Sequence, residues 1–149
     1  NDFQEKYPDF VLKEGDIVLA MTRPVIKNEL KVARLSESDS GSLLNQRVGR
    51  IIPKGKIVLD YLFFVLQFDG FVRQLEEAIA GSDPPNVSSA QIESLLVPLP
   101  EIKEQIQISS VINSIQSLID AKSKSLEKMQ LLKESISQDL ISGRKRVNI

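Results

Sequence analysis

The stretch Asp83-Pro84-Pro85-Asn86 holds the residues whose types and order come closest to a catalytic motif. It matches three of the four positions of the D-P-P-Y type motif that holds a flipped base during amino-group methylation of DNA. The fourth position needs an aromatic ring to stack on the base, and Asn86 has none. Methyl transfer also needs a glycine-rich loop for S-adenosylmethionine, and the sequence contains no G-x-G. The stretch is therefore predicted to be a rigid turn and not a catalytic site.

The composition removes most other catalytic chemistry. The 149 residues include no cysteine and no histidine, so disulfides, thiolate nucleophiles and the commonest general base and metal ligand are absent. We expect no catalytic residue, no metal site and no cofactor. No run approaches the roughly 18 apolar residues of a membrane helix, and no leader pattern opens the chain. A cytoplasmic binding protein that makes no contact with a membrane is expected.

Two residues of the turn region remain candidates for contact with phosphate groups. Asn86 and Ser88 follow the left-handed turn expected at Gly81, and main-chain NH groups and the Ser88 hydroxyl are groups that can bind a phosphate. The alternative is a purely structural turn. In that case Ser88 or Ser89 caps a following helix.

A second candidate group follows the first predicted strand, Asp16–Met21. Thr22 and Arg23 come directly after it. An arginine at a strand end suits bidentate contact with guanine or phosphate. The alternative for Arg23 is an exposed ion pair.

A third group, Asn45-Gln46-Arg47, opens the second predicted strand, Gln46–Ile52. The amides suit adenine edges and the guanidinium suits guanine or phosphate. Strand alternation is expected to turn at least one of the three side chains inward. Gln46 and Arg47 are therefore taken as candidate DNA contacts.

Charge is spread unevenly along a chain whose net charge is −1. Residues 23–56 contain eight basic residues against three acidic ones, whereas residues 60–101 contain one basic residue against seven acidic ones. A basic segment in a mildly acidic chain is typical of a localised phosphate-binding surface, with an ordinary solvated face as the alternative. Lys27, Lys31 and Arg50 are candidates for phosphate contacts that position without specifying.

These groups must be positioned by a small α+β domain over residues 1–100. Beside the two strands, Tyr61–Leu66 and Phe71–Ala80 favour helices, and Ser36–Ser42 reads as a flexible turn. Alternate prolines at Val97-Pro98-Leu99-Pro100 keep that segment extended and mark a boundary. Residues 101–149 then form a second domain, one long helix that ends at Gly143.

The long helix carries a 4-3 spacing over about five heptads, which predicts a coiled coil. A helix about 60 Å long cannot bury such a stripe on its own small domain, so a partner helix is required. Two of the ten positions are lysines. Either their burial sets the register and the number of helices in the coiled coil, or only their aliphatic stems lie on the seam while the ammonium groups reach solvent. The predicted interface consists of Ile108, Ile112, Ile115, Ile119, Lys122, Leu126, Met129, Lys133, Ile136 and Leu140.

The order of these pieces resembles the specificity subunit of type I restriction-modification enzymes. The pieces are G-D-I-V-L-A-M-T-R-P from Gly15, L-N-Q-R-V-G-R-I from Leu44, Y-L-F-F-V-L from Tyr61, G-S-D-P-P-N-V-S from Gly81, L-L-V-P-L-P-E-I-K-E-Q from Leu95 and D-L-I-S-G-R-K-R-V from Asp139. The resemblance implies a target recognition domain that reads one half of a bipartite site on double-stranded DNA. It implies a helix that pairs with a second specificity half or with another copy, and that docks methyltransferase and restriction subunits.

The chain departs from the family pattern in two respects. A full specificity subunit has two recognition domains and two long helices, whereas one of each is found here, and the usual opening strands of the domain are absent. A partial or half subunit is therefore expected. The alternative function, from another class, is a structural coiled-coil protein whose head binds protein.

Overall fold

The computed structural model describes residues 2–81 and 83–147. Residues 1, 82, 148 and 149 lie outside this description. They are the first residue of the first predicted domain, one residue of the predicted turn, and the last two residues of the second predicted domain. The chain divides into two compact units, Asn1–Gln107 and Ile108–Ile149. No helix in the described ranges is both long enough and apolar enough to cross a membrane.

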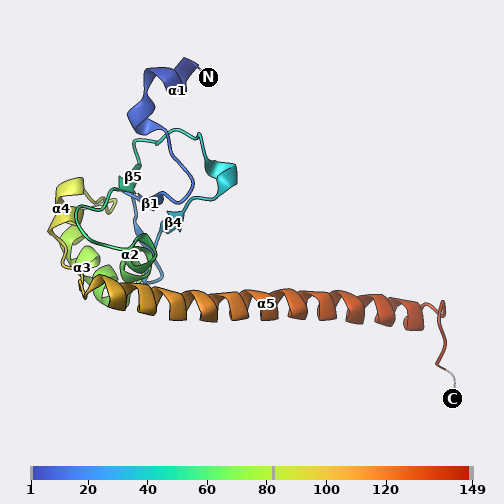
Figure 1. The fold of residues 1–149 in the computed structure, drawn as a ribbon. Coiled ribbons are helices and arrows are strands. Elements are labelled where there is room, and N and C mark those ends of the chain that lie inside the picture. The colour runs from blue at the N-terminus through green and yellow to red at the C-terminus, as the bar shows by residue number, and fades with distance from the viewer. Residues whose placement is uncertain (1, 82, 148–149) are drawn as a thin grey trace. The chain divides into compact units, whose positions relative to one another are not determined.

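The first unit combines short antiparallel strands with helices, and α2, α3 and α4 follow the last strand (Figure 1). The elements in chain order are α1 (Asp2–Lys6), the 3-10 turn η1 (Pro8–Phe10), β1 (Ile17–Ala20), β2 (Val25–Ile26), β3 (Glu29–Leu30), β4 (Val32–Arg34), the 3-10 turn η2 (Glu37–Asp39), β5 (Val48–Ile51), α2 (Leu59–Leu66), α3 (Asp69–Ile79), α4 (Ser89–Ser94) and α5 (Ile102–Ile141). The α+β class predicted from the sequence is confirmed. Both predicted strands and both predicted helices are present within a few residues of their expected bounds.

β1 is the central strand of a three-stranded antiparallel sheet of order β4-β1-β5. Its burial alternates along the strand, with Ile17 and Leu19 each 1% exposed and Val18 and Ala20 half-buried. This period of two leaves one face of the sheet for a core. Leu19 lies opposite Gly49 of β5 and Val32 of β4, which sets the register.

The core forms where helices cover that face of the sheet. α3 buries Phe71, Val72, Leu75 and Ile79, which lie on one side of the helix because they recur at intervals of three and four residues. Leu62 and Leu66 of α2, with Val87, complete the apolar cluster around β1. The sheet and its polar ends are thus held from one side by α2 and α3.

The extended segment after α4 is tied to this unit by side chains. The Tyr61 hydroxyl donates to the Pro98 carbonyl at 3.0 Å, and Gln74 bonds both the NH and the carbonyl of Leu96. Burial raises the pKa of the Tyr61 phenol, and the negative charge of Glu104 raises this pKa further. The segment with the alternate prolines is therefore held against the first unit by these side-chain hydrogen bonds.

α5 begins at Ile102, directly after the predicted boundary. Gln105, fully buried, belongs to the first unit: its Oε1 accepts from the Val58 NH at 2.8 Å, and its Nε2 donates to the Pro100 carbonyl at 2.8 Å. The compact units consequently divide after Gln107, somewhat later than residue 100.

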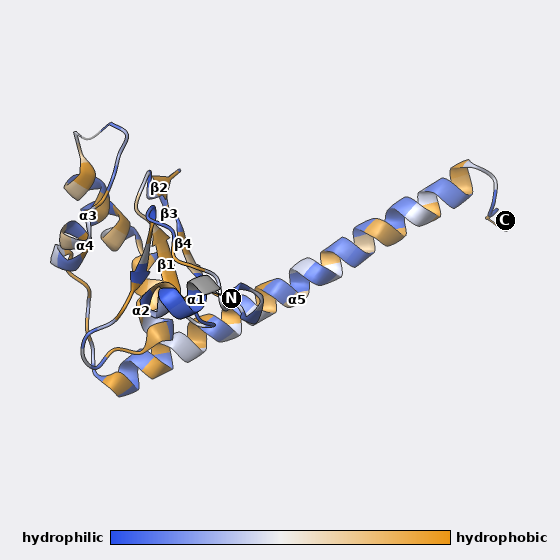
Figure 2. Ribbon diagram, turned by 90° about the horizontal axis from the view of Figure 1, so that it is seen from above, coloured by the Kyte–Doolittle hydropathy of each residue, from blue (hydrophilic) through white to orange (hydrophobic). Residues whose placement is uncertain are grey.

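The second unit is the rest of α5 and its C-terminal cap. Gly143 has a φ of 75°, and its NH donates to the Leu140 carbonyl, which confirms the predicted left-handed cap. Apolar and polar residues alternate in bands along the helix (Figure 2). On the predicted seam, Ile115, Ile119, Leu126, Met129, Ile136 and Leu140 are 41–63% exposed.

Candidate nucleic-acid interface

Three segments far apart in the sequence form one edge of the first unit, just beyond the end of β1. The Met21 NH donates to the Arg47 carbonyl at 2.8 Å, and the Met21 carbonyl accepts from the Val87 NH at 2.9 Å. The Arg23 NH donates to the Pro85 carbonyl at 2.7 Å. We call residues 21–23, 45–47 and 85–87 the three-segment edge.

Most of the predicted DNA contacts lie on this edge. Thr22 and Asn86 pair as an isolated antiparallel bridge, so the strand-end group and the turn group are direct neighbours. Arg23, Gln46 and Arg47 lie on the same edge, and their side chains are exposed. Backbone hydrogen bonds thus bring together residues that the sequence separates widely.

The expectation that one of Asn45, Gln46 and Arg47 points inward is wrong. All three are exposed, because β5 begins only at Val48 and these residues form the turn before it. The Asn45 side chain accepts from the Arg47 NH at 3.0 Å, which stabilises this turn. Strand alternation does not apply to residues outside the ladder.

Arg50 and Ser88 make contacts within the protein. The Arg50 guanidinium donates to the carbonyls of Val11 at 3.0 Å and Asp9 at 2.9 Å, and pairs with Asp16 at 3.5 Å. Ser88 is the N-cap of α4 and forms a reciprocal capping box with Gln91. The structural alternative for Ser88 is thus present, and Arg50 attaches the segment after η1 to β5.

The basic segment 23–56 is only partly neutralised within the protein. Its ion pairs are Arg34 with Asp60 at 2.6 Å, Arg50 with Asp16 at 3.5 Å and Lys54 with Glu93 at 3.9 Å. The remaining cations, Arg23, Lys27, Lys31, Arg47 and Lys56, form no ion pair with any described residue. Arg23 and Arg47 lie on the three-segment edge, and Lys27 lies in the turn of the β2–β3 hairpin that follows it. Lys31 comes directly after β3. Cations without an ion pair among the described residues are therefore found on the edge and on the adjoining hairpin.

The β2–β3 hairpin itself was missed by the sequence analysis. Its strands have two residues each, too few for a period to be recognised. The signal that could have found it was Asn28, a residue type that accepts left-handed backbone. It lies between Val25-Ile26, which favour a strand, and Glu29-Leu30, a polar residue followed by an apolar one. In Figure 2 this hairpin and the connection between α3 and α4 extend to the same side of the unit.

Gly81 and residues 83–86 lie in a turn, as predicted. Gly81 has a φ of 86°, and the Asp83–Pro84 peptide bond is cis. The Pro85 carbonyl is occupied by the Arg23 NH. Its proline-rich sequence thus serves to hold the turn against the end of β1.

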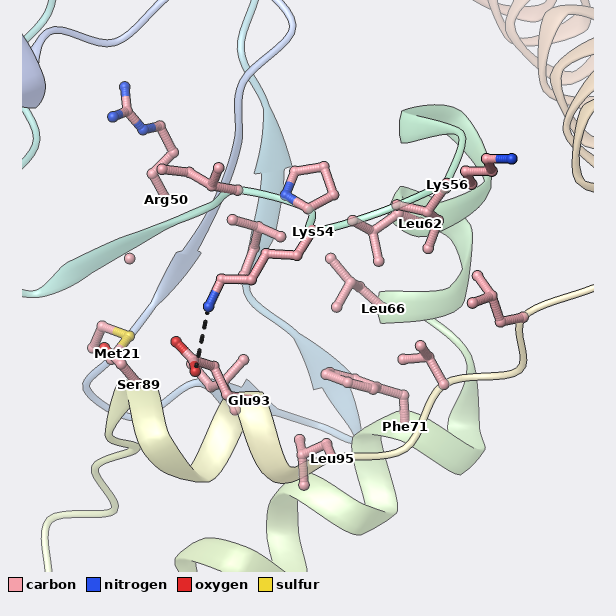
Figure 3. Close-up of a pocket in the computed structure, with 18 residues that line it drawn as sticks. Met21, Arg50, Lys54, Lys56, Leu62, Leu66, Phe71, Ser89, Glu93 and Leu95 are labelled. Carbon is pink, nitrogen blue, oxygen red and sulfur yellow. Dashed lines mark ion pairs between the residues drawn. The ribbon is translucent and has the colours of Figure 1, made fainter. Parts of the chain in front are cut away.

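A cavity of about 340 Å³ lies between the end of β5 and helices α2, α3 and α4, and Met21 of the three-segment edge is among the residues that line it. Its walls are mainly aliphatic and aromatic, with Leu62, Leu66 and Phe71 facing it in Figure 3. The Lys54–Glu93 pair spans its rim, and the Arg50 guanidinium is turned away from its apolar walls. Its lining therefore suits an apolar group.

Comparisons with known proteins identify the family of the chain. Residues 1–131 match the family described as type I restriction modification DNA specificity domain. The chain is 37% identical over 147 residues to the type I restriction enzyme MjaVIII specificity subunit of Methanocaldococcus jannaschii, covering 98% of this chain and 35% of that protein. It is 32% identical over 116 residues to the EcoAI specificity subunit of Escherichia coli, covering 77% of this chain and 20% of that protein.

The fold also matches a solved structure. The crystal structure of the HsdS subunit from Thermoanaerobacter tengcongensis superposes with a TM-score of 0.63 at 22% identity, over 86% of this chain and 32% of that one. The chain thus spans about a third of the first relative and of this structure. On the match over residues 1–131 and the long alignment with MjaVIII, the chain belongs to the type I restriction modification DNA specificity domain family.

Proposed function

We propose that the chain is a DNA-recognition module of a type I restriction-modification system, and that its first unit reads one half of a bipartite site. One observation carries the proposal: backbone hydrogen bonds join three distant segments into an edge where cations without an ion pair among the described residues gather. Such an edge suits a polyanion. Membership of the family supports the same function.

The side chains on the edge and on the β2–β3 hairpin divide into two roles in this proposal. Arg23, Gln46, Arg47 and Asn86 reach base edges or phosphates, because guanidinium and amide groups match the hydrogen-bonding patterns of guanine and adenine. Lys27 contacts phosphate and positions the protein without specifying a base. Thr22 lies between them, in the bridge to Asn86.

In the same proposal α5 is the docking element. Its exposed apolar seam pairs with a helix from a second specificity half or another copy, and holds methyltransferase and restriction subunits. The support is the sustained 4-3 spacing and the exposure of apolar residues along the seam. The chain contributes no catalytic group, and methylation and cleavage belong to the partner subunits.

Salt dependence of DNA binding tests this function. The chain, assembled with its methyltransferase subunits, is titrated with duplex DNA at several salt concentrations. We expect a plot of log affinity against log salt concentration to have a negative slope of several units. Arg47→Ala should make this slope smaller by about 0.9 if the guanidinium neutralises one phosphate.

Arg73→Ala is the matched control, because Arg73 is an exposed arginine on α3 within the acidic segment. Its slope should equal that of the wild type. A complex that binds no duplex DNA would exclude the proposed function. Equal effects of the two arginine substitutions would exclude the three-segment edge as the DNA-facing surface.

A further inference from the structure

The β2–β3 hairpin ends in the two-residue turn Lys27-Asn28. Ile26 pairs with Glu29 across the turn, and φ is 51° at Lys27 and 62° at Asn28. Two successive left-handed residues are the signature of the type I′ turn, whose twist matches that of its strands. Both side chains at the tip are exposed.

The base of the hairpin is anchored in the domain. Leu30 is 8% exposed and belongs to the apolar core, and Pro24 is fully buried. The Lys31 NH donates to the Pro24 carbonyl at 2.7 Å, and the Lys31 carbonyl accepts from the Ala20 NH at 3.0 Å. The tip is therefore presented on a rigid support that continues from β1.

Unusual backbone conformations concentrate at this hairpin. Among the described residues, the non-glycine residues with positive φ are Arg23, at 47°, Lys27 and Asn28. Asparagine tolerates this region, whereas lysine and arginine adopt it at a cost. Such strain is found preferentially at functional sites, where a particular side chain is needed in spite of it. Here it occurs at two cations, Arg23 and Lys27, and at one amide, Asn28.

We infer that the β2–β3 hairpin enters the DNA major groove and that Asn28 reads an adenine there, an inference that rests on the function proposed above. A two-stranded ribbon fits the major groove, and the side-chain amide of asparagine complements N6 and N7 of adenine. Glu29 is exposed beside the tip and would be repelled by phosphates. Its charge therefore favours a tip directed at base edges, where amino groups donate, with Lys27 reaching a flanking phosphate.

Glycine substitutions separate side-chain recognition from turn formation. Asn28→Gly removes the amide but keeps the turn, because glycine accepts positive φ without strain. Lys27→Gly removes the cation in the same way. Asn28→Asp keeps the size of the side chain but leaves only acceptors, which suit the amino group of cytosine. Thermal melts of the assembled complex should show that all three variants fold.

The measurement is selection from a duplex library with randomised positions. The full chain, assembled with its methyltransferase subunits, selects sequences that are then read by sequencing. Asn28→Gly should reduce the preference for adenine at one position by about 10-fold or more, and Asn28→Asp should change that preference towards cytosine. Lys27→Gly should leave base preferences unchanged and weaken all sequences alike, with a salt slope smaller by about 0.9.

Each other outcome overturns the inference. If the wild type selects a motif and Asn28→Gly selects the same motif with equal preference at every position, the hairpin is not the reader, although the proposed function stands. If the glycine variants reduce assembly with the methyltransferase subunits and leave base selection intact, the tip is a protein contact. If the wild type binds DNA without selecting any motif, both the inference and the proposed function fail.

Discussion

At the scale of single residues, identical side chains only three positions apart have different environments. Arg47 lies in the turn before β5 with its side chain exposed, whereas Arg50 lies within the strand and binds two backbone carbonyls and Asp16. Both were predicted to meet DNA, since an arginine in a basic segment suits either role. Which guanidinium has a partner inside the protein depends on η1 and the residues after it, far away in the sequence.

Gln105 shows the same dependence in a buried polar group. Its amide bonds the Val58 NH at the start of α2 and the Pro100 carbonyl before α5. Because the residue is fully buried, water cannot replace the lost partner of either backbone group. We expect Gln105→Ala to lower the free energy of unfolding by roughly 1–3 kcal/mol, which urea titration would measure.

Gln107→Ala is the control for this effect. Gln107 lies two residues further on in the same helix and is exposed. Both substitutions therefore change the helix propensity by the same amount, but Gln107→Ala leaves the hydrogen bonds of Gln105 intact. A Gln105→Ala variant as stable as Gln107→Ala would show that the buried amide does not hold α5 to the first unit.

At the scale of elements, α4 depends on its cap. A helix of six residues is too short to be stable by itself, and the Ser88 hydroxyl accepts from the Gln91 NH at 3.2 Å. The Gln91 side chain also donates to the Ala78 carbonyl at 2.6 Å, which joins α4 to α3. The capping box therefore positions the turn that carries Asn86.

Replacing the cap should cost measurable stability. We predict that Ser88→Ala lowers the free energy of unfolding by about 1 kcal/mol, and that Ser89→Ala, one residue later, changes it far less. Denaturant titration of both variants measures the difference. A fall in DNA affinity for Ser88→Ala with unchanged stability would instead identify the hydroxyl as a phosphate contact.

Elements with a strong period were predictable, and very short ones were not. β1 and β5, α2 and α3, and α5 each have enough residues to show a period of two, an apolar run or a 4-3 repeat. β2, β3 and β4 have two or three residues each, and their pairing depends on neighbours in space. The hairpin that carries Asn28 was missed for this reason.

At the scale of the whole molecule, α5 exposes a long stripe of apolar side chains. Ile119, Leu126 and Met129 are each more than half exposed, and Leu118 and Leu132 widen the apolar face. Exposed apolar stripes of this length mark an interface. We propose that a partner helix covers this stripe.

A charge placed on the seam should separate the partners. We predict that Ile119→Glu, or deletion of residues 112–149, abolishes self-association or docking to the methyltransferase subunits, as measured by light scattering and co-purification. Ser117→Glu introduces the same charge off the predicted seam and should leave both intact. Equal association of the two glutamate variants would contradict the predicted seam.

By itself the sequence determined the family, the α+β class and the positions of the periodic elements, because these depend on local spacing and on the order of motifs. Only the tertiary structure decided which side chains share a surface. The hydrogen bonds of Met21 to Arg47 and to Val87 form between segments with no common local pattern. Likewise, the ion pair of Arg50 removes a cation that composition alone would assign to DNA. Contacts between residues distant in sequence arise from the packing of the whole domain, which no single stretch encodes.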